Sequence, residues 1–328
     1  MTKELRILIS RTDAIGDVCL TLPACRALKA AFPTAKLTYL CKAYTKEVVA
    51  CFEPISHILT LEALEIASKE QRNEILGNFD VVIHLFPNKA VAKWCKAAQI
   101  PKRIGTAHRF FHFFTCNVLP RFTRKRSDLH EAQLNFKLLA PLGIQTIPSL
   151  DQMNQHLAFL PNGTNEFPEF KKEDNIILLH PKSNGSGVEY PIEKYIELAE
   201  ILAQKGYRIY FTGTEKEGAL FRKQIPIHPN IKDATGLWDL KTFITVISKS
   251  KALIACSTGP YHIAGVTGIK AIGLFAQRKP IHPGRWAALG RQAQALTSEG
   301  VCENCAAGKE CRCIEEISIQ AISYALEK

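Results

Sequence analysis

Residues 6–32 read RILISRTDAIGDVCLTLPACRALKAAF. The apolar run RILIS reads as a strand, and a polar turn with a glycine–aspartate pair, Gly16 and Asp17, leads from it into an amphipathic segment. A strand that passes through a turn into a helix is the repeating unit of a parallel α/β fold. Ligands of such folds bind at the carboxyl ends of strands, so an acid in this turn is a candidate functional residue.

The same alternation continues along the chain and then restarts. Residues 151–175, rich in Pro, Gly, Asn and charge, interrupt it as a linker between domains does. The pattern predicts an α/β protein of two Rossmann-like halves, with parallel sheets facing a central cleft. The expected strands are residues 6–10, 36–41, 80–86, 102–106, 175–180, 208–213, 252–256 and 270–275. The expected helices are residues 17–32, a segment ending near 79, and residues 130–143, 191–206, 239–250 and 259–268.

Composition limits the class of protein. A chain of 328 residues fits two domains, and 46% hydrophobic with 22% charged residues excludes a disordered chain or a fibre. The N-terminus lacks the features of a secretory signal, and no stretch approaches the roughly 20 apolar residues of a membrane span. We therefore expect a cytoplasmic protein, soluble or peripheral on a membrane.

The net charge of +11 favours acidic partners: phosphorylated sugars, nucleotides, nucleic acid or anionic lipid headgroups. Residues 119–130, LPRFTRKRSDLH, form the densest basic stretch. It is either a solvated loop or a surface that meets a polyanion. The basic side chains in question are Arg121, Arg124, Lys125 and Arg126.

The turn after the first strand admits two interpretations. Asp17, in the first turn of the expected helix, either complements the helix dipole, worth roughly 0.3–1 kcal/mol, or acts on a ligand. Asp13 is an N-cap candidate with the same ambiguity.

A second turn of this kind lies in residues 252–265, ALIACSTGPYHIAG. Ser257, Thr258 and Gly259 end a strand and open a helix, where backbone N–H groups and the positive end of the dipole form a phosphate site. His262 follows within the first turn and is either a packed residue or a ligand contact.

Three common nucleotide motifs are missing from the sequence. It has no G-x-G-x-x-G after the first strand, no G-x-x-x-x-G-K-[ST] and no Asp-x-Asp pair. A nicotinamide dehydrogenase and a P-loop NTPase are therefore not indicated. A diphosphate bound here has to be neutralised by a helix end and basic side chains.

Other candidates follow strands of the second half. Lys182 and Ser183 lead into a Gly/Ser-rich loop and suit phosphate or sugar, although an exposed lysine needs no function. Gly213 and Glu215 follow the next strand, where a carboxylate suits a ribose. Trp238 lies before a helix and suits either adenine stacking or core packing.

Eleven cysteines, an odd number, indicate a reducing compartment rather than a disulfide framework. Seven are scattered among apolar neighbours and are expected to be buried thiols. The other four occupy residues 302–313, CENCAAGKECRC, in a C-x-x-C and a C-x-C pair. Their spacing suits a structural zinc site, or thiols that are free or reversibly oxidised, and a catalytic role is not expected. These four are Cys302, Cys305, Cys311 and Cys313.

Taken in order, these stretches resemble the bacterial ADP-heptose–lipopolysaccharide heptosyltransferases, family-nine glycosyltransferases of the GT-B fold. The segments that carry the resemblance are residues 6–33, 102–106, 128–144, 178–199, 210–217 and 253–275, and they span nearly the whole chain. The resemblance implies that Asp17 is the catalytic base and that the turn at Ser257 holds the donor diphosphate. The expected donor-binding residues are Asp13, Gly16, Lys182, Ser183, Gly213, Glu215, Trp238, Ser257, Thr258, Gly259 and His262.

The resemblance also implies a division of labour. Residues 1–160 are expected to form an acceptor-binding domain and residues 161–328 a donor-binding domain, with a last helix, about residues 314–328, packing back on the first domain. The reaction it implies is an inverting, metal-independent transfer of heptose from ADP-heptose to a phosphorylated glycolipid, lipid A–Kdo or an extended inner core. The implied enzyme is a monomer that needs no cofactor, docks on the cytoplasmic face of the inner membrane through its basic surface and binds no nucleic acid.

Two departures from the family pattern keep alternatives open. Many members carry a Lys or Arg before the aromatic–Pro pair, where this chain has Val188 and Glu189, and many have Asp at the position of Ser257. A same-fold transferase for another nucleotide sugar or acceptor therefore remains an alternative. A catalytically silent nucleotide-sugar-binding protein is a second, which the joint presence of Asp17, Thr258 and His262 disfavours. Nucleic-acid binding is a third, and it rests on charge alone.

Overall fold

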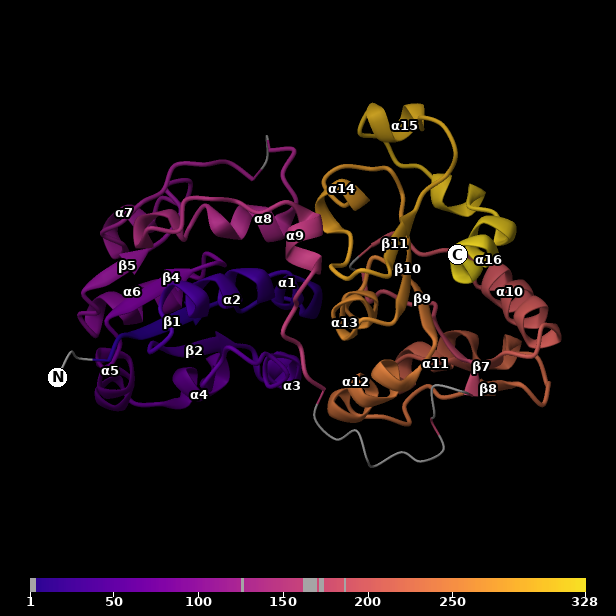
Figure 1. Ribbon diagram of the computed structural model, residues 1–328, viewed down its shortest axis with the longest axis horizontal. Helices are drawn as coiled ribbons and strands as arrows, with labels where there is room; N and C mark the ends of the chain where they lie inside the picture. Colours follow the sequence, from indigo (N-terminus) through magenta and orange to yellow (C-terminus); the bar gives the residue numbers. More distant parts are fainter. Residues whose placement is uncertain (1–3, 125–126, 162–169, 171–173, 186) are drawn as a thin grey trace. The chain divides into compact units, whose positions relative to one another are not determined.

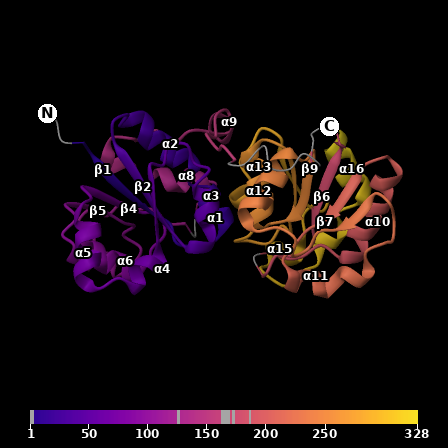
Figure 2. The same cartoon turned by 90° about the horizontal axis from the view of Figure 1, so that it is seen from below.

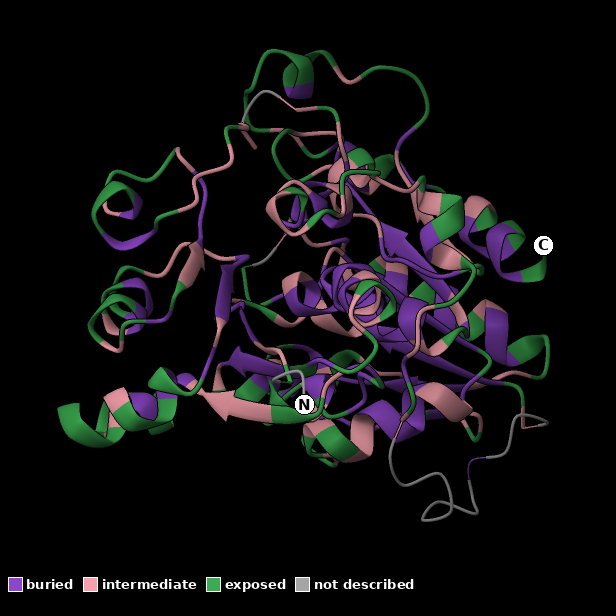
Figure 3. Ribbon diagram, turned by 60° about the vertical axis from the view of Figure 1, so that its left-hand side comes forward, coloured by how far each residue is buried: buried purple, intermediate pink, exposed green. Residues whose placement is uncertain are grey.

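The structure is a computed structural model that describes residues 4–124, 127–161, 170, 174–185 and 187–328. It consists of two compact units, residues 1–160 and 161–328. Each unit is a parallel sheet with helices around it, as Figures 1 and 2 show. Figure 3 shows that the strands are mostly buried and that the helices are exposed on their outer faces. Among the described residues, no helix has the length and apolar character that a membrane crossing requires.

In the described part of the first unit, five strands form a sheet in the order β3-β2-β1-β4-β5, and every neighbouring pair is parallel. The central strands are apolar and buried almost throughout, as expected for a sheet covered on both faces. The strands are β1 (Arg6–Ser10), β2 (Lys36–Cys41), β3 (His57–Thr60), β4 (Val81–His84) and β5 (Lys102–Ile104). The helices are α1 (Ile15–Cys19), α2 (Leu22–Ala31), α3 (Lys46–Val49), α4 (Leu61–Ile66), α5 (Lys69–Gly77), α6 (Lys89–Ala97), α7 (His112–Thr115), α8 (Glu131–Phe136) and α9 (Leu150–Asn154), with 3-10 turns at Ala43–Thr45 and Ala140–Leu142.

Two expected long helices are interrupted. Residues 17–32 form parts of two helices, because Pro23, at the start of α2, has no N–H for a hydrogen bond to the preceding turn. Residues 130–143 form α8 and then a 3-10 turn that contains Pro141. Gly143 ends that turn in the left-handed conformation, with φ of 88°. Proline placement therefore accounts for both differences.

In the described part of the second unit, six parallel strands follow the order β11-β10-β9-β6-β7-β8. The strands are β6 (Ile176–His180), β7 (Arg208–Phe211), β8 (Ile231–Asp233), β9 (Ala252–Cys256), β10 (Lys270–Leu274) and β11 (Ala293–Leu296). The helices are α10 (Ile192–Gln204), α11 (Glu215–Phe221), α12 (Leu240–Lys249), α13 (Gly259–Thr267), α14 (Pro283–Trp286), α15 (Glu303–Ala306) and α16 (Ile319–Glu327), with 3-10 turns at Arg222–Gln224 and Cys313–Glu316.

The final helix, α16, packs within the second unit. The apolar side chains of α16 are buried in the core of the second unit, where the helix contacts α10, β10 and β11. Figure 1 shows α16 beside α10. The second unit's own sheet therefore buries the apolar face of this helix, and its packing on the first domain stays a prediction. The residues of that face are Ile319, Ile322, Ala325 and Leu326.

A close backbone contact fixes the position of α13. A Cβ added to Gly265 would lie 2.3 Å from the carbonyl oxygen of Leu289. Gly290, with φ of +144°, approaches equally closely, since its Cβ would lie 2.2 Å from the carbonyl oxygen of Gly265. The helix therefore packs on residues 289–290 without an intervening side chain, and this contact positions the turn at its N-terminus.

Candidate functional site

In the first unit, the side chain of Arg11 gathers three carboxylates just beyond the carboxyl end of β1. Its Nε donates to Asp13 Oδ1 at 2.9 Å, its Nη1 donates to Glu131 Oε1 at 3.2 Å, and its Nη2 donates to Asp17 Oδ1. The side chain of Arg11 is only 3% exposed. Burial alone would lower the pKa of Arg11, but the three carboxylates outweigh it and raise the pKa, so this guanidinium stays charged.

A second arginine, Arg124, forms an ion pair with Glu131. Arg124 Nε donates to Glu131 Oε1 at 3.0 Å, and its Nη2 donates to the Leu85 carbonyl at 3.2 Å and to Asn135 Oδ1 at 3.4 Å. Asn135 also accepts from Arg11 Nη1 at 3.2 Å. This is a buried ion-pair network joined by charge-assisted hydrogen bonds, and it links α8 to the turn after β1.

Only part of the basic stretch, residues 119–130, is therefore available as an exposed docking surface. Arg124, expected as a docking residue, points into this network instead, because the buried carboxylate of Glu131 needs a second cation. Arg121 is exposed, as a docking residue should be. Lys125 and Arg126 lie outside the described residues.

Asp13 does not cap α1. The N-cap position is Ala14, which makes no side-chain cap, and the carboxylate of Asp13 is held by Arg11 instead. The Tyr44 hydroxyl donates to the Asp13 carbonyl at 3.0 Å, so the backbone of the turn is also held. Gly16 is buried within α1, and Asp17 lies in its first turn, as expected.

The two aspartates carry excess negative charge. Asp13, Asp17 and Glu131 supply three negative charges, against two positive charges from Arg11 and Arg124. Burial raises the pKa of Asp13, and the nearby Asp17 raises it further, against the opposing effect of Arg11, so that it reaches about 7. The carboxyl of Asp13 therefore keeps its proton to a much higher pH than an ordinary aspartate does.

This proton predicts a pH dependence of stability. The folded chain holds it up to about pH 7, whereas an Asp with the ordinary value of 3.8 loses it earlier, so unfolding releases a proton between these values. Stability should then fall as pH rises through this window, by up to about 1.4 kcal/mol per pH unit. Asp13→Asn, which has no such proton, should gain in Tm relative to wild type from pH 4.5 to 7. A Tm difference that stays constant over this range would contradict the assignment.

In the second unit, the turn after β9 has the features of an anion site. Thr258 is the N-cap of α13, its side chain makes no capping hydrogen bond, and Gly259 and Pro260 open the helix. No acid lies in the first turn. The N–H groups at this helix end lack intrahelical acceptors and carry the positive end of the dipole, which favours phosphate.

Beside this turn lies a pocket of about 290 Å³. Gly187 approaches Ser257 closely, since a Cβ on Gly187 would lie 3.3 Å from Ser257 Cβ. Arg278 and Lys279, from the loop after β10, bring two cations to the wall. Neither Arg278 nor Lys279 was among the residues predicted from the sequence, although both follow the carboxyl end of a strand, as the other candidates do. The lining residues are Gly185, Gly187, Val188, Ser257, Leu274, Phe275, Ala276, Arg278, Lys279, Pro280 and Ile281.

Lys182 and Ser183 are engaged by a carboxylate. Lys182 Nζ lies 2.8 Å from Glu189 Oε2, and Ser183 donates to Glu189 Oε1 from its backbone N–H at 2.9 Å and from its hydroxyl at 3.2 Å. Burial opposes ionisation of Glu189, but these hydrogen bonds outweigh it and lower the pKa of this carboxyl. The positive charge of Lys182 is therefore largely neutralised within the loop.

Glu215 and Trp238 have partners within the protein. Both carboxylate oxygens of Glu215 accept from Arg222, at 2.7 and 2.8 Å. The Trp238 ring stacks on Phe243, with centroids 6.1 Å apart and planes at 17°. Neither residue is among those that line the described pocket. The half-buried Trp238 ring therefore packs on an aromatic neighbour, and its stacking on adenine stays a prediction.

The remaining candidates are buried or clustered. His262, only 3% exposed, lies in the first turn of α13 with its ring 5.4 Å from that of Tyr261. Gly213 precedes the N-cap Thr214 of α11. The seven scattered cysteines are buried, as expected. The other four lie together, with all Sγ atoms within 4.8 Å of one another: Cys302, Cys305, Cys311 and Cys313.

Comparison with known proteins assigns the family. Residues 71–315 match the profile of glycosyltransferase family 9 (heptosyltransferase), a range that includes the Ser257 turn and the pocket but begins after Asp17. A Haemophilus influenzae protein named "Putative glycosyltransferase" is 26% identical over 298 residues, 86% of this chain and 85% of that protein.

Two solved structures confirm the GT-B fold. The glycosyl transferase family 9 structure from Veillonella parvula DSM 2008 superposes with a TM-score of 0.78 at 21% identity, covering 100% of this chain and 98% of that one. The E. coli heptosyltransferase WaaC with ADP superposes with a TM-score of 0.75 at 17% identity, covering 98% and 99%. Because the family profile matches most of its length, this chain belongs to glycosyltransferase family 9, the heptosyltransferases, and is a glycosyltransferase.

Proposed function

We propose that this enzyme transfers a heptose from ADP-heptose to the inner core of lipopolysaccharide, with inversion at the anomeric carbon. The observation that carries the proposal is the pocket beside the N-terminus of α13, which combines backbone N–H groups with the cations Arg278 and Lys279. A nucleoside diphosphate has the charge and size for such a site. The related WaaC structure contains ADP, which supports this choice of nucleotide.

The donor diphosphate sits at Ser257, Thr258 and Gly259 in this proposal. Arg278 and Lys279 take the place of the cation that many family members carry at the position of Val188 or Glu189. Lys182 contributes less, because Glu189 already binds it. The helix end and the two cations then stabilise the negative charge that grows on ADP as it leaves, an electrostatic effect that is usually the largest in such reactions.

The first unit supplies the base. A carboxylate oxygen of Asp17 takes the proton of the acceptor hydroxyl, and the hydroxyl oxygen forms a bond to the anomeric carbon of the heptose. The bond from that carbon to the diphosphate breaks on the opposite face, so its electron pair leaves with ADP and configuration inverts. Arg11 is a positioning residue, because its guanidinium holds Asp17 and is itself held by Glu131. No metal ion takes part in this scheme.

The acceptor is a phosphorylated glycolipid in this proposal, lipid A–Kdo or an extended inner core. The net charge of +11 suits the anionic cytoplasmic face of the inner membrane, with Arg121 as an exposed contact. We place the enzyme in the cytoplasm as a monomer that needs no cofactor and binds no nucleic acid. The pairing of Glu189 with Lys182 makes transfer of another nucleotide sugar a second candidate, because this loop departs from the family pattern.

The test compares ADP binding by calorimetry in two double variants. Arg278→Ala/Lys279→Ala removes both pocket cations, whereas Lys216→Ala/Lys241→Ala removes the same charge from exposed positions away from the pocket. Charge-assisted hydrogen bonds contribute about 1.5–3 kcal/mol each, so the Kd for ADP should rise at least 10-fold in the first variant. It should change less than about twofold in the second.

Two outcomes would contradict the proposal. Wild-type protein that binds no ADP excludes the donor site. The second outcome is a protein that binds ADP but forms no ADP when it is incubated with ADP-heptose and deacylated lipid A–Kdo without added metal. This result excludes either the donor or the acceptor. A parallel assay with other nucleotide sugars then identifies the second candidate.

A further inference from the structure

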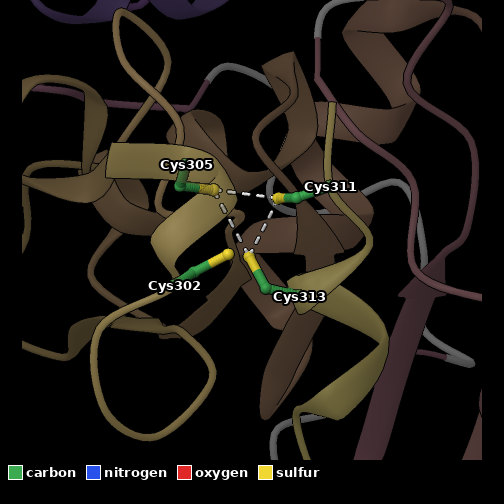
Figure 4. Close-up of side chains that lie close together, drawn as sticks. All are labelled: Cys302, Cys305, Cys311 and Cys313. Atoms are coloured by element: carbon green, nitrogen blue, oxygen red, sulfur yellow. Dashed lines mark hydrogen bonds between the residues drawn. The ribbon is translucent and has the colours of Figure 1, made fainter. Parts of the chain in front are cut away.

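Four cysteine side chains converge in a segment that the proposed reaction does not use. Figure 4 shows the sulfur atoms of Cys302, Cys305, Cys311 and Cys313 pointing toward one another. The Sγ of Cys305 lies 2.9 Å from that of Cys311 and 3.6 Å from that of Cys313, and Cys311 and Cys313 are 3.4 Å apart. None of the four is in a disulfide.

Two of these distances, 3.6 Å between Cys305 and Cys313 and 3.4 Å between Cys311 and Cys313, suit metal coordination better than covalent pairing. A disulfide requires sulfurs about 2.05 Å apart, and each of the three sulfur–sulfur distances is longer. Four thiolates about 2.3 Å from one metal ion in a tetrahedron lie roughly 3.8 Å from one another. The cluster, with all sulfurs within 4.8 Å, has nearly this size.

The local fold builds the cluster from two short pieces of chain. Cys302 is the N-cap of α15 and Cys305 lies in that helix, so their spacing of three residues places both sulfurs on one side. Gly308, with φ of +68°, lies between α15 and the second pair of cysteines. Cys305 and Cys313 are buried, whereas Cys302 and Cys311 are partly exposed, which leaves a path for an ion.

We propose that these four cysteines hold one divalent thiophilic metal ion, zinc or iron, in a closed tetrahedral site. An all-thiolate tetrahedral ligand set favours these metals, and four protein ligands leave no position for a substrate. The role is therefore structural. The ion ties residues 302–313 to the hydrophobic core of the second unit, because Cys313 and the next residue, Ile314, are part of that core.

The site also braces the loop that follows β10. The Cys302 N–H donates to Gln277 Oε1 at 3.0 Å, and Gln277 Nε2 donates to the carbonyls of Ser298 at 3.0 Å and Gly300 at 2.8 Å. The next two residues, Arg278 and Lys279, line the pocket. Metal binding thus holds one wall of the pocket in place. This consequence for donor binding rests on the proposed function, whereas metal binding itself does not.

The test measures metal content without substrate. Full-length protein purified under reducing conditions is analysed by elemental mass spectrometry, and we expect about one zinc or iron ion per chain. Cobalt added to metal-stripped protein should give the intense visible bands of a tetrahedral tetrathiolate complex. The Cys302→Ser/Cys311→Ser variant should lose both signals, while Cys51→Ser, in which serine can keep the hydrogen bond to the Glu47 carbonyl, should retain them.

Hydrogen exchange adds a readout that is independent of activity. Removing the metal from wild type with a chelator should speed amide exchange in residues 297–313 and 276–281 and leave the first unit unchanged. Three results would overturn the proposal. Reduced protein could take up no zinc, iron or cobalt, or the double serine variant could keep the wild-type metal content. The third is the presence of disulfides within the cluster after purification under reducing conditions. Failure of ADP binding with metal present overturns only the proposed function.

Discussion

Asp17→Asn is expected to lower the kcat of heptose transfer by roughly 10²–10⁴-fold and to leave the Kd for ADP unchanged. The substitution keeps the size of the side chain and an acceptor oxygen for Arg11, but it removes the carboxylate that takes the proton from the acceptor. General-base catalysis contributes about this factor. Single-turnover transfer from ADP-heptose, together with calorimetry of ADP, measures both quantities.

The matched control is Asp151→Asn, an exposed aspartate in the first turn of α9. It removes the same charge from the first unit and should leave the rate within a factor of two. An Asp17→Asn enzyme that keeps more than a tenth of the wild-type rate would show that the base lies elsewhere.

Arg11→Met is expected to destabilise the first unit by about 3–5 kcal/mol. The variant leaves the carboxylates of Asp13 and Asp17 without the cation that both of them contact, and Glu131 with Arg124 alone. For a unit of this size, the loss corresponds to a fall in Tm of roughly 6–20 °C. Thermal unfolding followed by circular dichroism measures it.

Arg11→Lys separates the positioning role from stability. A lysine keeps the charge, but its single nitrogen does not reproduce the three separate contacts of the guanidinium. We expect a smaller loss of Tm, a fall in kcat of at least about 10-fold with KM for the donor unchanged, and a shifted pH profile of kcat. A lysine variant with wild-type kcat and pH profile would reduce Arg11 to a structural residue.

Much of the fold follows from local sequence. The runs at residues 6–10, 176–180 and 252–256 are mostly apolar, as expected for strands buried on both faces, and the structure has strands at each of them. The missed strands β3, β8 and β11 lie at or near sheet edges and are short or only partly buried, so their pattern is weak. For α16, the amphipathic pattern shows which face is buried but not which sheet buries it.

The candidate site was also only partly predictable from the sequence. The turn at Ser257 was predictable, because a strand end, a Ser-Thr-Gly run and a helix start are neighbours in sequence. The partners of Arg11 were not, because Glu131 lies 120 positions away and its buried pairing depends on tertiary packing. Likewise, nothing local indicated that Glu189 neutralises Lys182 or that Arg278 and Lys279 reach the pocket wall.

The contact between Gly265 and Gly290 has a consequence for how this enzyme can vary. Helix α13, which follows Ser257, is held by main-chain atoms at Gly265, so surrounding side chains can change without moving the helix. The two glycines themselves tolerate no larger residue, since any Cβ would overlap a carbonyl oxygen. The loops around the pocket can therefore diverge among related enzymes, while the turn proposed to bind phosphate keeps its place in the fold.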